Sequence, residues 1–465
     1  MSRLDTLERA VNWFDTGRFH NELARRIAWQ TESDGGQISQ QLRQYLEEEI
    51  MPTLSELGFV CELFDEVMPG GGPILIARRI EDPALPTLLT YGHGDVVNGQ
   101  QGKWRAGLDP WRLVVEGDRW YGRGSADNKG QHSINFAALA SVIAARQGKL
   151  GYNVTVLFEM GEEAGSPGLN EFCERERERL RADLFLASDG PRVQSSLPTL
   201  FLGSRGLVNF SLSLRSRERA YHSGNWGGVL RNPGVIIAHA VASLVDQRGR
   251  ILVKGLLPPA LNDAMRKALR EIPVGQDPGD PEIDPGWGEP GLSPAEQLVG
   301  WNTLEVLSLG AASIEHPINA IPSAATAHLQ LRFVPGTRWQ ELEQIVREHL
   351  DAHGFEEVEL KIRASSAATR LDIEHPWVAW ALSSMSKSAG KPAVLMPNLA
   401  GSLPNDVFAD TLGLPTLWVP HSYPSCAQHA PNEHLLGSVA REGLQIMAGL
   451  FWDLGEAGLA WSRRK

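Results

Sequence analysis

The stretch LLTYGHGD, residues 88–95, and the stretch YGRGSADNK, residues 121–129, indicate the architecture of the whole chain. In the first, an apolar run without helical periodicity ends in glycines and polar residues, which predicts a buried strand followed by a tight turn. His93 and Asp95 are two residues apart, so on an extended chain both side chains point the same way. One can bind a metal while the other orients the imidazole. The second stretch places Asp127 ahead of an expected helix, and polar groups at strand ends are where α/β proteins place their chemistry.

The pattern of apolar residues divides the chain into three segments. Up to about residue 200, apolar strands alternate with helices, which predicts an α/β domain with a mostly parallel sheet flanked by helices. Strictly alternating strands then follow at residues 206–214 and 325–333, and together with two helices they predict a smaller inserted α+β domain. The last hundred residues return to the α/β pattern. The smaller domain is therefore expected to be inserted into the first one.

Composition and charge argue against several classes of protein. A chain of 465 residues exceeds a single core, so two or three domains are expected. The net charge of −12 argues against a nucleic-acid partner and against anionic membranes. No stretch reaches the ~20 apolar residues that span a bilayer, and the N-terminus lacks the apolar core of a signal peptide. Three scattered cysteines do not make a disulfide framework, so a soluble, cytoplasmic protein is expected.

Several strand ends and a C-terminal motif carry side chains that can bind metal: His93, Asp127, Glu162, Glu163, Asp189 and His429. Carboxylates and imidazoles without a thiolate suit zinc, manganese or cobalt(II). Two histidines and three carboxylates are enough for a pair of metals if Asp127 bridges them. Glu162 and Glu163 cannot both point at one spot from a regular strand. One is therefore expected to coordinate, and the other to take a proton from water and return it to the leaving amine.

Each of these residues also has a structural interpretation. A histidine after a strand is more often a hydrogen-bonded structural residue, and adjacent glutamates are usually surface charges. Asp189 could cap the next helix, and His429 could be a loop histidine. Taken together the pattern is more specific, because four separate strand ends finish in metal-capable groups flanked by glycine or serine.

The motifs GHGDVV, GRGSADNKG, EMGEEAGS, SDG, HSG and HAPNE, in this order, resemble those of the co-catalytic di-zinc metallopeptidase and amidohydrolase family. Its members include carnosinase and related dipeptidases, carboxypeptidase G, acetylornithine deacetylase and succinyl-diaminopimelate desuccinylase. The resemblance runs from about residue 20 to the end. It implies a mostly parallel zinc-peptidase sheet flanked by helices, made of residues 1–202 and 365–465. The insertion, residues 203–364, would form a ferredoxin-like lid through which two copies form a homodimer.

The resemblance also implies roles for single residues around two divalent ions, zinc first and manganese or cobalt as alternatives. Asp95 orients a ligand histidine, and Glu162 is the general base. The implied ligands are His93 and Asp189 on one metal, Glu163 and His429 on the other, and Asp127 as the bridge.

Five further residues match positions that contact the substrate in this family. His222 corresponds to a histidine that stabilises the oxyanion, often from the partner subunit, since a tetrahedral oxyanion needs a donor beyond the metals. Asn319 and Arg332 match lid positions that hold the substrate carboxylate, which arginine can bind bidentately. Gly401 and Ser402 match a loop near the substrate's terminus. Without the resemblance, His222 could be a plain turn residue and Arg332 a surface residue.

The residue at position 189 favours one branch of the family. This ligand is aspartate in aminopeptidases and dipeptidases and glutamate in the deacylases and carboxypeptidase G, and the long stretch of residues 256–300 also resembles the carnosinase-like members. The prediction is a dipeptidase-like hydrolase that cleaves a peptide or amide bond in a small, carboxylate-bearing substrate. The alternative is a deacylase of N-acyl or N-carbamoyl amino acids. A non-catalytic metal-dependent binding protein would be expected if Glu162 were lost.

Overall fold

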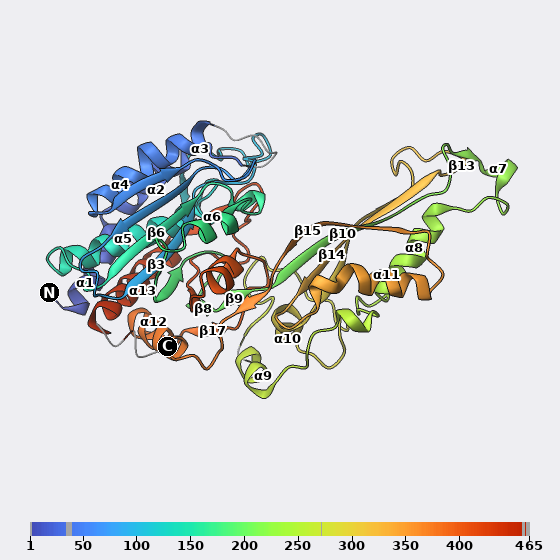
Figure 1. Ribbon diagram of the computed structural model, residues 1–465. Helices are drawn as coiled ribbons and strands as arrows, with labels where there is room; N and C mark the ends of the chain where they lie inside the picture. The colour runs from blue at the N-terminus through green and yellow to red at the C-terminus, as the bar shows by residue number, and fades with distance from the viewer. Residues whose placement is uncertain (1, 34–39, 271, 458–460, 462–465) are drawn as a thin grey trace.

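The computed structural model describes residues 2–33, 40–270, 272–457 and 461, which form two bodies with separate sheets and hydrophobic cores (Figure 1). The smaller body extends away from the larger one along the strands β10 (Gly206–Arg215), β14 (Ala324–Phe333) and β15 (Glu359–Ser366). The expected fold class, an α/β protein with a smaller α+β part, is confirmed. The exact limits of the insertion, residues 203 and 364, stay predictions.

The larger body is built on an eight-stranded mixed sheet. Its central strands, β6, β3, β7 and β18, are parallel to one another, and antiparallel pairs occur towards the two edges. Every residue of β6 is buried, as expected for a strand covered on both faces. The order across the sheet is β1 (Val60–Phe64), β2 (Ile74–Arg79), β6 (Asn153–Glu159), β3 (Thr87–His93), β7 (Leu184–Ala187), β18 (Thr416–Trp418), β8 (Thr199–Phe201) and β17 (Val394–Met396).

Helices cover both faces of this sheet. One face packs against α1 (Arg3–Asp15), α2 (Arg18–Ile27), α3 (Gln40–Tyr45), α4 (Met51–Glu56), α5 (Lys129–Ala145), α12 (Pro376–Ala389) and α13 (Gly437–Ala457). The other face packs against α6 (Leu169–Arg175) and the π-helical turn η5 (Val407–Thr411). None of the helices in the described ranges could serve as a membrane span.

Two small antiparallel pairings bring distant parts of the chain together. β5 (Arg119–Tyr121) pairs with β4 (Val114–Glu116) on one side and with β19 (His434–Leu436) on the other. β9 (Gly203–Ser204) pairs with β16 (Thr369–Arg370) where the chain enters and leaves the smaller body. The pairing of β5 with β19 matters for the site, because the loop with Asp127 follows β5 and the loop with His429 precedes β19.

The smaller body is a four-stranded antiparallel sheet with the order β12 (Thr303–Gly310), β14, β10 and β15. Its apolar residues pack against α8 (Pro233–Leu244) and α11 (Leu342–Ala352), because alternate residues of β10 and β14 face inward. This strand order and the two helices make the ferredoxin-like arrangement. At the far end, β11 (Tyr221–His222) pairs with β13 (Ala320–Ile321) beside α7 (Ser223–Trp226).

Two helices that lie between β10 and β12 in the sequence pack on the larger body rather than on the lid sheet. These are α9 (Asp263–Arg270) and α10 (Pro294–Gly300). Met265 and Val299 belong to the same buried cluster as Met396 and Phe408, which sit on or beside the large sheet. The two bodies are therefore joined by packed side chains as well as by the strands that connect them.

Candidate metal centre

The polar residues predicted as ligands gather at the carboxyl ends of the parallel strands. His93 is the last residue of β3, and Asp189 follows β7 by two residues. Glu162 and Glu163 follow β6 in a single 3₁₀ turn, Glu162–Ala164. The tight turn after His93 needs glycine at position 94, because a Cβ there would lie 2.5 Å from a ring carbon of Tyr45. Parallel strands bring their carboxyl ends to one edge, which is where this site lies.

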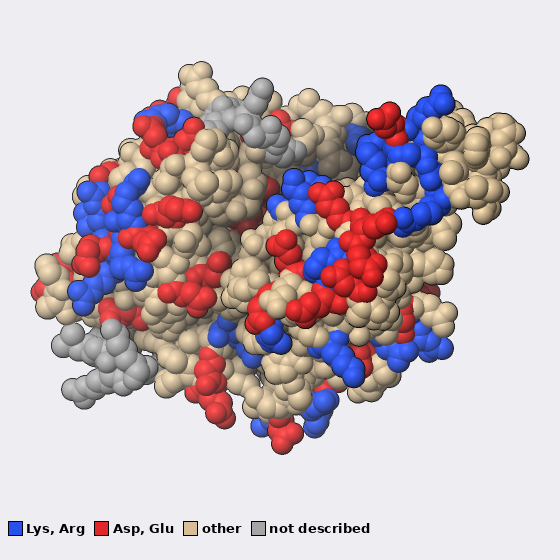
Figure 2. All heavy atoms as spheres, turned by 45° about the vertical axis from the view of Figure 1, so that its right-hand side comes forward, with Lys and Arg blue, Asp and Glu red and all other residues tan. Residues whose placement is uncertain are grey.

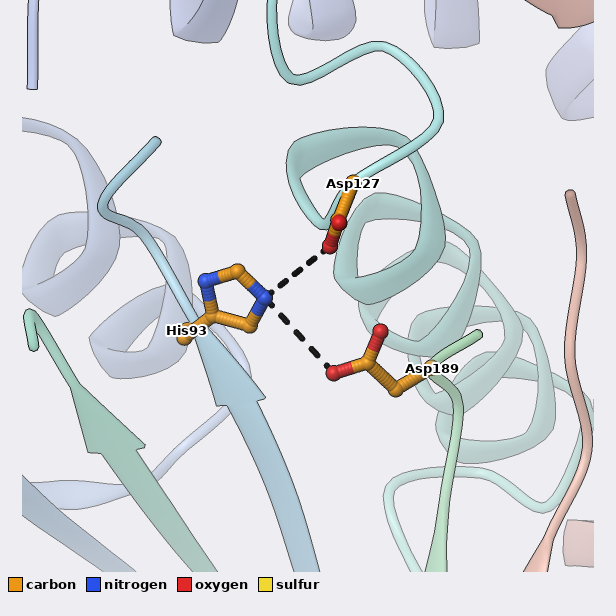
Figure 3. A group of neighbouring side chains, drawn as sticks. All are labelled: His93, Asp127 and Asp189. Carbon is orange, nitrogen blue, oxygen red and sulfur yellow. Dashed lines mark hydrogen bonds and ion pairs between the residues drawn. The ribbon is translucent and has the colours of Figure 1, made fainter. Parts of the chain in front are cut away.

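His93, Asp127 and Asp189 form a first triad (Figure 3). One nitrogen or oxygen of each lies within 4.8 Å of the others, and all three residues are buried. Nε2 of His93 is 3.2 Å from Asp127 Oδ1 and 3.6 Å from Asp189 Oδ2. An imidazole and two carboxylates at this spacing can surround one divalent cation.

Asp127, Glu163 and His429 form a second triad that shares Asp127 with the first. Nε2 of His429 lies 3.0 Å from Asp127 Oδ2 and 3.0 Å from Glu163 Oε2. The two oxygens of Asp127 therefore face the two histidines, one each. A carboxylate in this position can bridge two cations, which is the arrangement of two-metal hydrolytic sites.

Asp95 links the first histidine to the glutamate turn. Nδ1 of His93 lies 3.1 Å from the main-chain oxygen of Asp95 and 3.3 Å from its Oδ1. The ring therefore presents its other nitrogen, Nε2, to Asp127 and Asp189, as a metal-binding histidine must. Asp95 also accepts the main-chain N–H groups of Glu162 at 3.2 Å and Glu163 at 3.0 Å.

The two glutamates point to different parts of the centre. Glu163 reaches His429, whereas Oε2 of Glu162 lies 3.9 Å from Nε2 of His93 and makes no closer ion pair among the described residues. The expected division of the pair therefore has a physical basis, because the 3₁₀ turn directs successive side chains about 120° apart.

Burial and close packing shift the pKa values of the cluster. Hydrogen bonds with Asp127 and Glu163 raise the pKa of His429 to about 11. Burial, reinforced by the charge of Asp127, raises the pKa of Glu163 to about 7 and that of Asp189 to about 6. Burial opposes the charge of His93, but hydrogen bonds to Asp127 and Asp95 raise its pKa well above the ordinary value. Protons and cations therefore compete for these groups, and metal binding should release protons.

The donor set fits divalent metal ions. Oδ2 of Asp189 is buried and makes no hydrogen bond within the described residues, although it faces the centre. A buried carboxylate oxygen without a partner is costly and calls for a cation or a water molecule. The mixture of two imidazoles and three carboxylates without thiolates suits zinc, manganese or cobalt.

The loop that carries His429 lies between β18 and β19 and holds several residues in the left-handed region. Ala427, His429 and Asn432 have φ angles of 58°, 61° and 66°. Strain of this kind in residues other than glycine persists where surrounding contacts enforce it. Here Gln428 donates to Asp127 Oδ2, and Gln100 donates to the main-chain oxygen of His429 at 3.0 Å.

A second group of predicted residues meets at the base of the lid. Arg332, on β14, donates to Ser402 Oγ at 3.4 Å, and Ser402 in turn donates to the main-chain oxygen of Arg205 at 2.8 Å. Gly401 is the neighbour of Ser402 in this loop. Arg205 was not among the predicted site residues. Only 4% of this residue is exposed. Burial, together with the nearby charge of Arg332, lowers the pKa of Arg205 to about 10. Within the described residues neither arginine forms an ion pair with a carboxylate.

His222 and Asn319 lie at the far end of the lid, away from the metal-binding cluster (Figure 1). They are neighbours there, because the main-chain N–H of Ser223 donates to the main-chain oxygen of Asn319. Nδ1 of the exposed His222 accepts the N–H of Gly224 at 3.1 Å. A single copy of the chain therefore does not bring these two residues to the predicted ligands.

Several apolar side chains are exposed at the end of the lid that carries His222. Trp226, Val229, Ile314 and Ile318 are all exposed in the segments at this end. Figure 2 shows acidic and basic side chains interspersed over one face of the molecule, with a largely uncharged end protruding at the upper right. Exposed apolar groups in such number on a protrusion are typical of a protein interface.

Comparison with known proteins gives concordant results. A family model described as peptidase family M20/M25/M40 matches residues 89–453. The Beta-Ala-His dipeptidase of Mus musculus is 30% identical over 403 residues, which cover 80% of this chain and 78% of the relative. The Cys-Gly metallodipeptidase of Saccharomyces cerevisiae is 25% identical over 401 residues, which cover 81% of each.

Solved structures share the fold. Human carnosine dipeptidase 1 superposes with a TM-score of 0.77 at 23% identity, over 97% of this chain and 99% of that one. A metallo-carboxypeptidase of the M20 family from Sulfolobus solfataricus superposes with a TM-score of 0.80 at 24% identity, over 94% and 99% of the two chains. The similarity spans the large sheet and the lid together.

Proposed function

Because the chain belongs to peptidase family M20/M25/M40, we propose that it is a metal-dependent dipeptidase that hydrolyses the peptide bond of small substrates with a free carboxylate. The observation that carries this proposal is the shared carboxylate of Asp127, which faces His93 with one oxygen and His429 with the other. The names of the relatives support the substrate class, since Beta-Ala-His and Cys-Gly are dipeptides. Asp189 supports it too, as the residue expected in dipeptidases.

The two triads would hold two divalent ions, zinc being the first choice and manganese or cobalt the alternatives. When bound, such a pair polarises the scissile carbonyl and lowers the pKa of a water molecule. The chain's own residues then have separate tasks. His93, Asp189, Glu163 and His429 would each hold one of the two ions, and Asp127 would serve both.

Glu162 is the proposed general base. Its carboxylate lies beside His93 without a closer ion-pair partner among the described residues, so it is free to act on water. It takes a proton from the attacking water and returns it to the nitrogen of the leaving amine. Asp95 positions Glu162 by accepting its main-chain N–H, and it orients His93 at the same time.

His222 is the proposed donor to the oxyanion, supplied by the lid of a second copy in a homodimer. The Gly224 N–H donates to Nδ1, so a neutral His222 carries its proton on Nε2 and presents it outward. The tetrahedral oxyanion needs such a donor. The apolar end of the lid supports the homodimer, because it needs a partner surface.

Arg332 and Arg205 are the proposed binding site for the substrate carboxylate, with Ser402, Gly401 and, from the partner's lid, Asn319 around it. The two guanidinium groups repel each other: after burial, the charge of Arg332 lowers the pKa of Arg205, against the opposing charge of Glu305. An anion placed against them would relieve this repulsion and be held bidentately.

The enzyme is proposed to act in the cytoplasm, because its three cysteines are all free, as is usual in a reducing compartment. A hydrolysis panel tests the proposal as a whole. Metal-stripped enzyme is reconstituted with Zn²⁺, Mn²⁺ or Co²⁺ and offered free dipeptides, N-acetyl amino acids and N-carbamoyl amino acids. Metal-dependent cleavage of the dipeptides supports it. Cleavage of the N-blocked compounds alone would instead identify a deacylase.

A further inference from the structure

We infer that Glu433 is a positioning residue whose carboxylate holds the Asp127 loop in place and thereby sets the affinity of the protein for both metal ions. The inference rests on the proposed two-metal centre. Glu433 belongs to the motif HAPNE but contacts no predicted ligand side chain. It acts instead on the main-chain N–H groups of Gly124, Ala126 and Asp127, in the loop that carries the bridging carboxylate.

Both oxygens of Glu433 are fully used. Oε1 accepts the main-chain N–H groups of Ala126 at 3.0 Å and Asp127 at 3.1 Å. Oε2 accepts the N–H of Gly124 at 3.1 Å and a guanidinium N–H of Arg123 at 2.6 Å. Only 1% of either charged side chain is exposed. Four donors converge on one buried carboxylate, so the loop is folded around it.

The position of Glu433 in the fold explains why it can reach this loop. It directly precedes β19, and its main-chain oxygen accepts the N–H of Gly122, which directly follows β5. The loop with His429 thus ends, and the loop with Asp127 begins, on the same antiparallel pair of strands. The side chain of Glu433 adds a second tie between two loops that are about 300 residues apart in sequence.

Arg123 extends this tie to a third segment. Its other terminal nitrogen donates to the main-chain oxygen of Asn98 at 3.0 Å, and its guanidinium lies over the ring of Trp104. The same segment contacts the His429 loop through Gln100 and through Arg105, whose N–H donates to Asn432. The charged pair therefore lies where the loops of Asp127 and His429 meet the segment of residues 98–105.

Position 433 requires a carboxylate, because both of its side-chain oxygens must accept hydrogen bonds. A glutamine offers one oxygen, so its NH₂ group would face two of the four N–H donors and leave them unsatisfied in a buried place. The loop would have to shift, and the side chain of Asp127 with it. Because Asp127 belongs to both triads, both sites should weaken together.

The test is calorimetric titration of metal-free enzyme with Zn²⁺. Glu433→Gln is compared with wild type and with Glu49→Gln, a control that alters another buried ion pair, between Glu49 and Arg26. We expect Zn²⁺ affinity to fall roughly ten- to a hundredfold at both sites in Glu433→Gln, the usual effect of removing a group that orients metal ligands. The control should lose thermal stability but keep its Zn²⁺ affinity, and saturating Zn²⁺ should restore much of the turnover of Glu433→Gln.

Unchanged affinity in folded Glu433→Gln, or loss at one site alone, would overturn the inference. If that variant does not fold, Glu433→Asp replaces it, because this side chain keeps the charge but is one methylene too short to accept from all four donors. Weaker Zn²⁺ binding at both sites is expected for Glu433→Asp as well, and unchanged binding would overturn the inference. A wild-type protein that binds no Zn²⁺ would overturn the proposed function itself, which distinguishes the two failures.

Discussion

Oδ2 of Asp127 lies 3.0 Å from Nε2 of His429, while Oδ1 of the same carboxylate lies 3.2 Å from Nε2 of His93. One side chain thus belongs to two potential cation sites, and each remaining ligand belongs to one. Substitutions at shared and unshared positions should therefore differ in the number of ions that they remove.

Asp127→Asn should abolish tight binding of both ions, whereas Asp189→Asn should leave one, because Asp189 belongs only to the triad with His93. The measurement is metal content per chain after dialysis against trace Zn²⁺. Asp351→Asn, an exposed change on α11, serves as the control and should bind two ions. Equal loss in the Asp127 and Asp189 variants would contradict the shared position.

Glu162→Gln should keep both ions but lower kcat by roughly 10²- to 10⁴-fold, the usual contribution of a general base. The side chain keeps its volume, yet the amide cannot accept a proton from water. Metal content and kcat are measured on the same preparation, with Glu174→Gln on the exposed face of α6 as the control. A variant that turned over at the wild-type rate would show that another group is the base.

Local patterns in the sequence were enough to predict the fold class and the edge of the sheet where the site lies. Apolar runs ending in His93, in the Glu162 pair and before Asp189 each mark a strand end, and parallel strands bring those ends together. The family is confirmed by its model. The roles of individual ligands stay predictions that the variants above test.

Patterns in the sequence could not predict contacts between residues that are far apart in the chain. The hydrogen bonds of Glu433 join two loops that are about 300 residues apart in sequence. The fold alone places the buried Arg205 beside Arg332. Nor could the sequence indicate that α9 and α10 pack on the large sheet's core. Such features depend on how elements meet in space, which residue periodicity does not encode.

Arg332→Met should shift the preference of the enzyme towards substrates that lack a C-terminal carboxylate. Loss of a charged hydrogen bond costs ~1.5–3 kcal/mol, so kcat/KM for dipeptides should fall roughly ten- to a hundredfold. The same dipeptides with a C-terminal amide should be little affected, because they offer no carboxylate to Arg332 or Arg205. Arg363→Met, an exposed change on the same sheet of the lid, is the control. Equal losses for both kinds of substrate would exclude the proposed carboxylate site.

His222 should act across the dimer, because the lid end that carries it lies far from the ligands of its own chain. Glu162→Ala and His222→Ala should each be nearly inactive alone. When the two variants are mixed and allowed to exchange subunits, each mixed dimer gains one site with an intact Glu162 and the partner's intact histidine. With random exchange, about a quarter of wild-type activity is expected.

The control for this experiment is His328→Ala, an exposed histidine on the same lid, which should be active without mixing. Analytical ultracentrifugation of the wild type checks that a dimer forms at all. If the mixture stayed as inactive as its components although subunits had exchanged, His222 would act within its own chain or not at all. Recovery after mixing would instead require that each site is completed by the lid of the other copy.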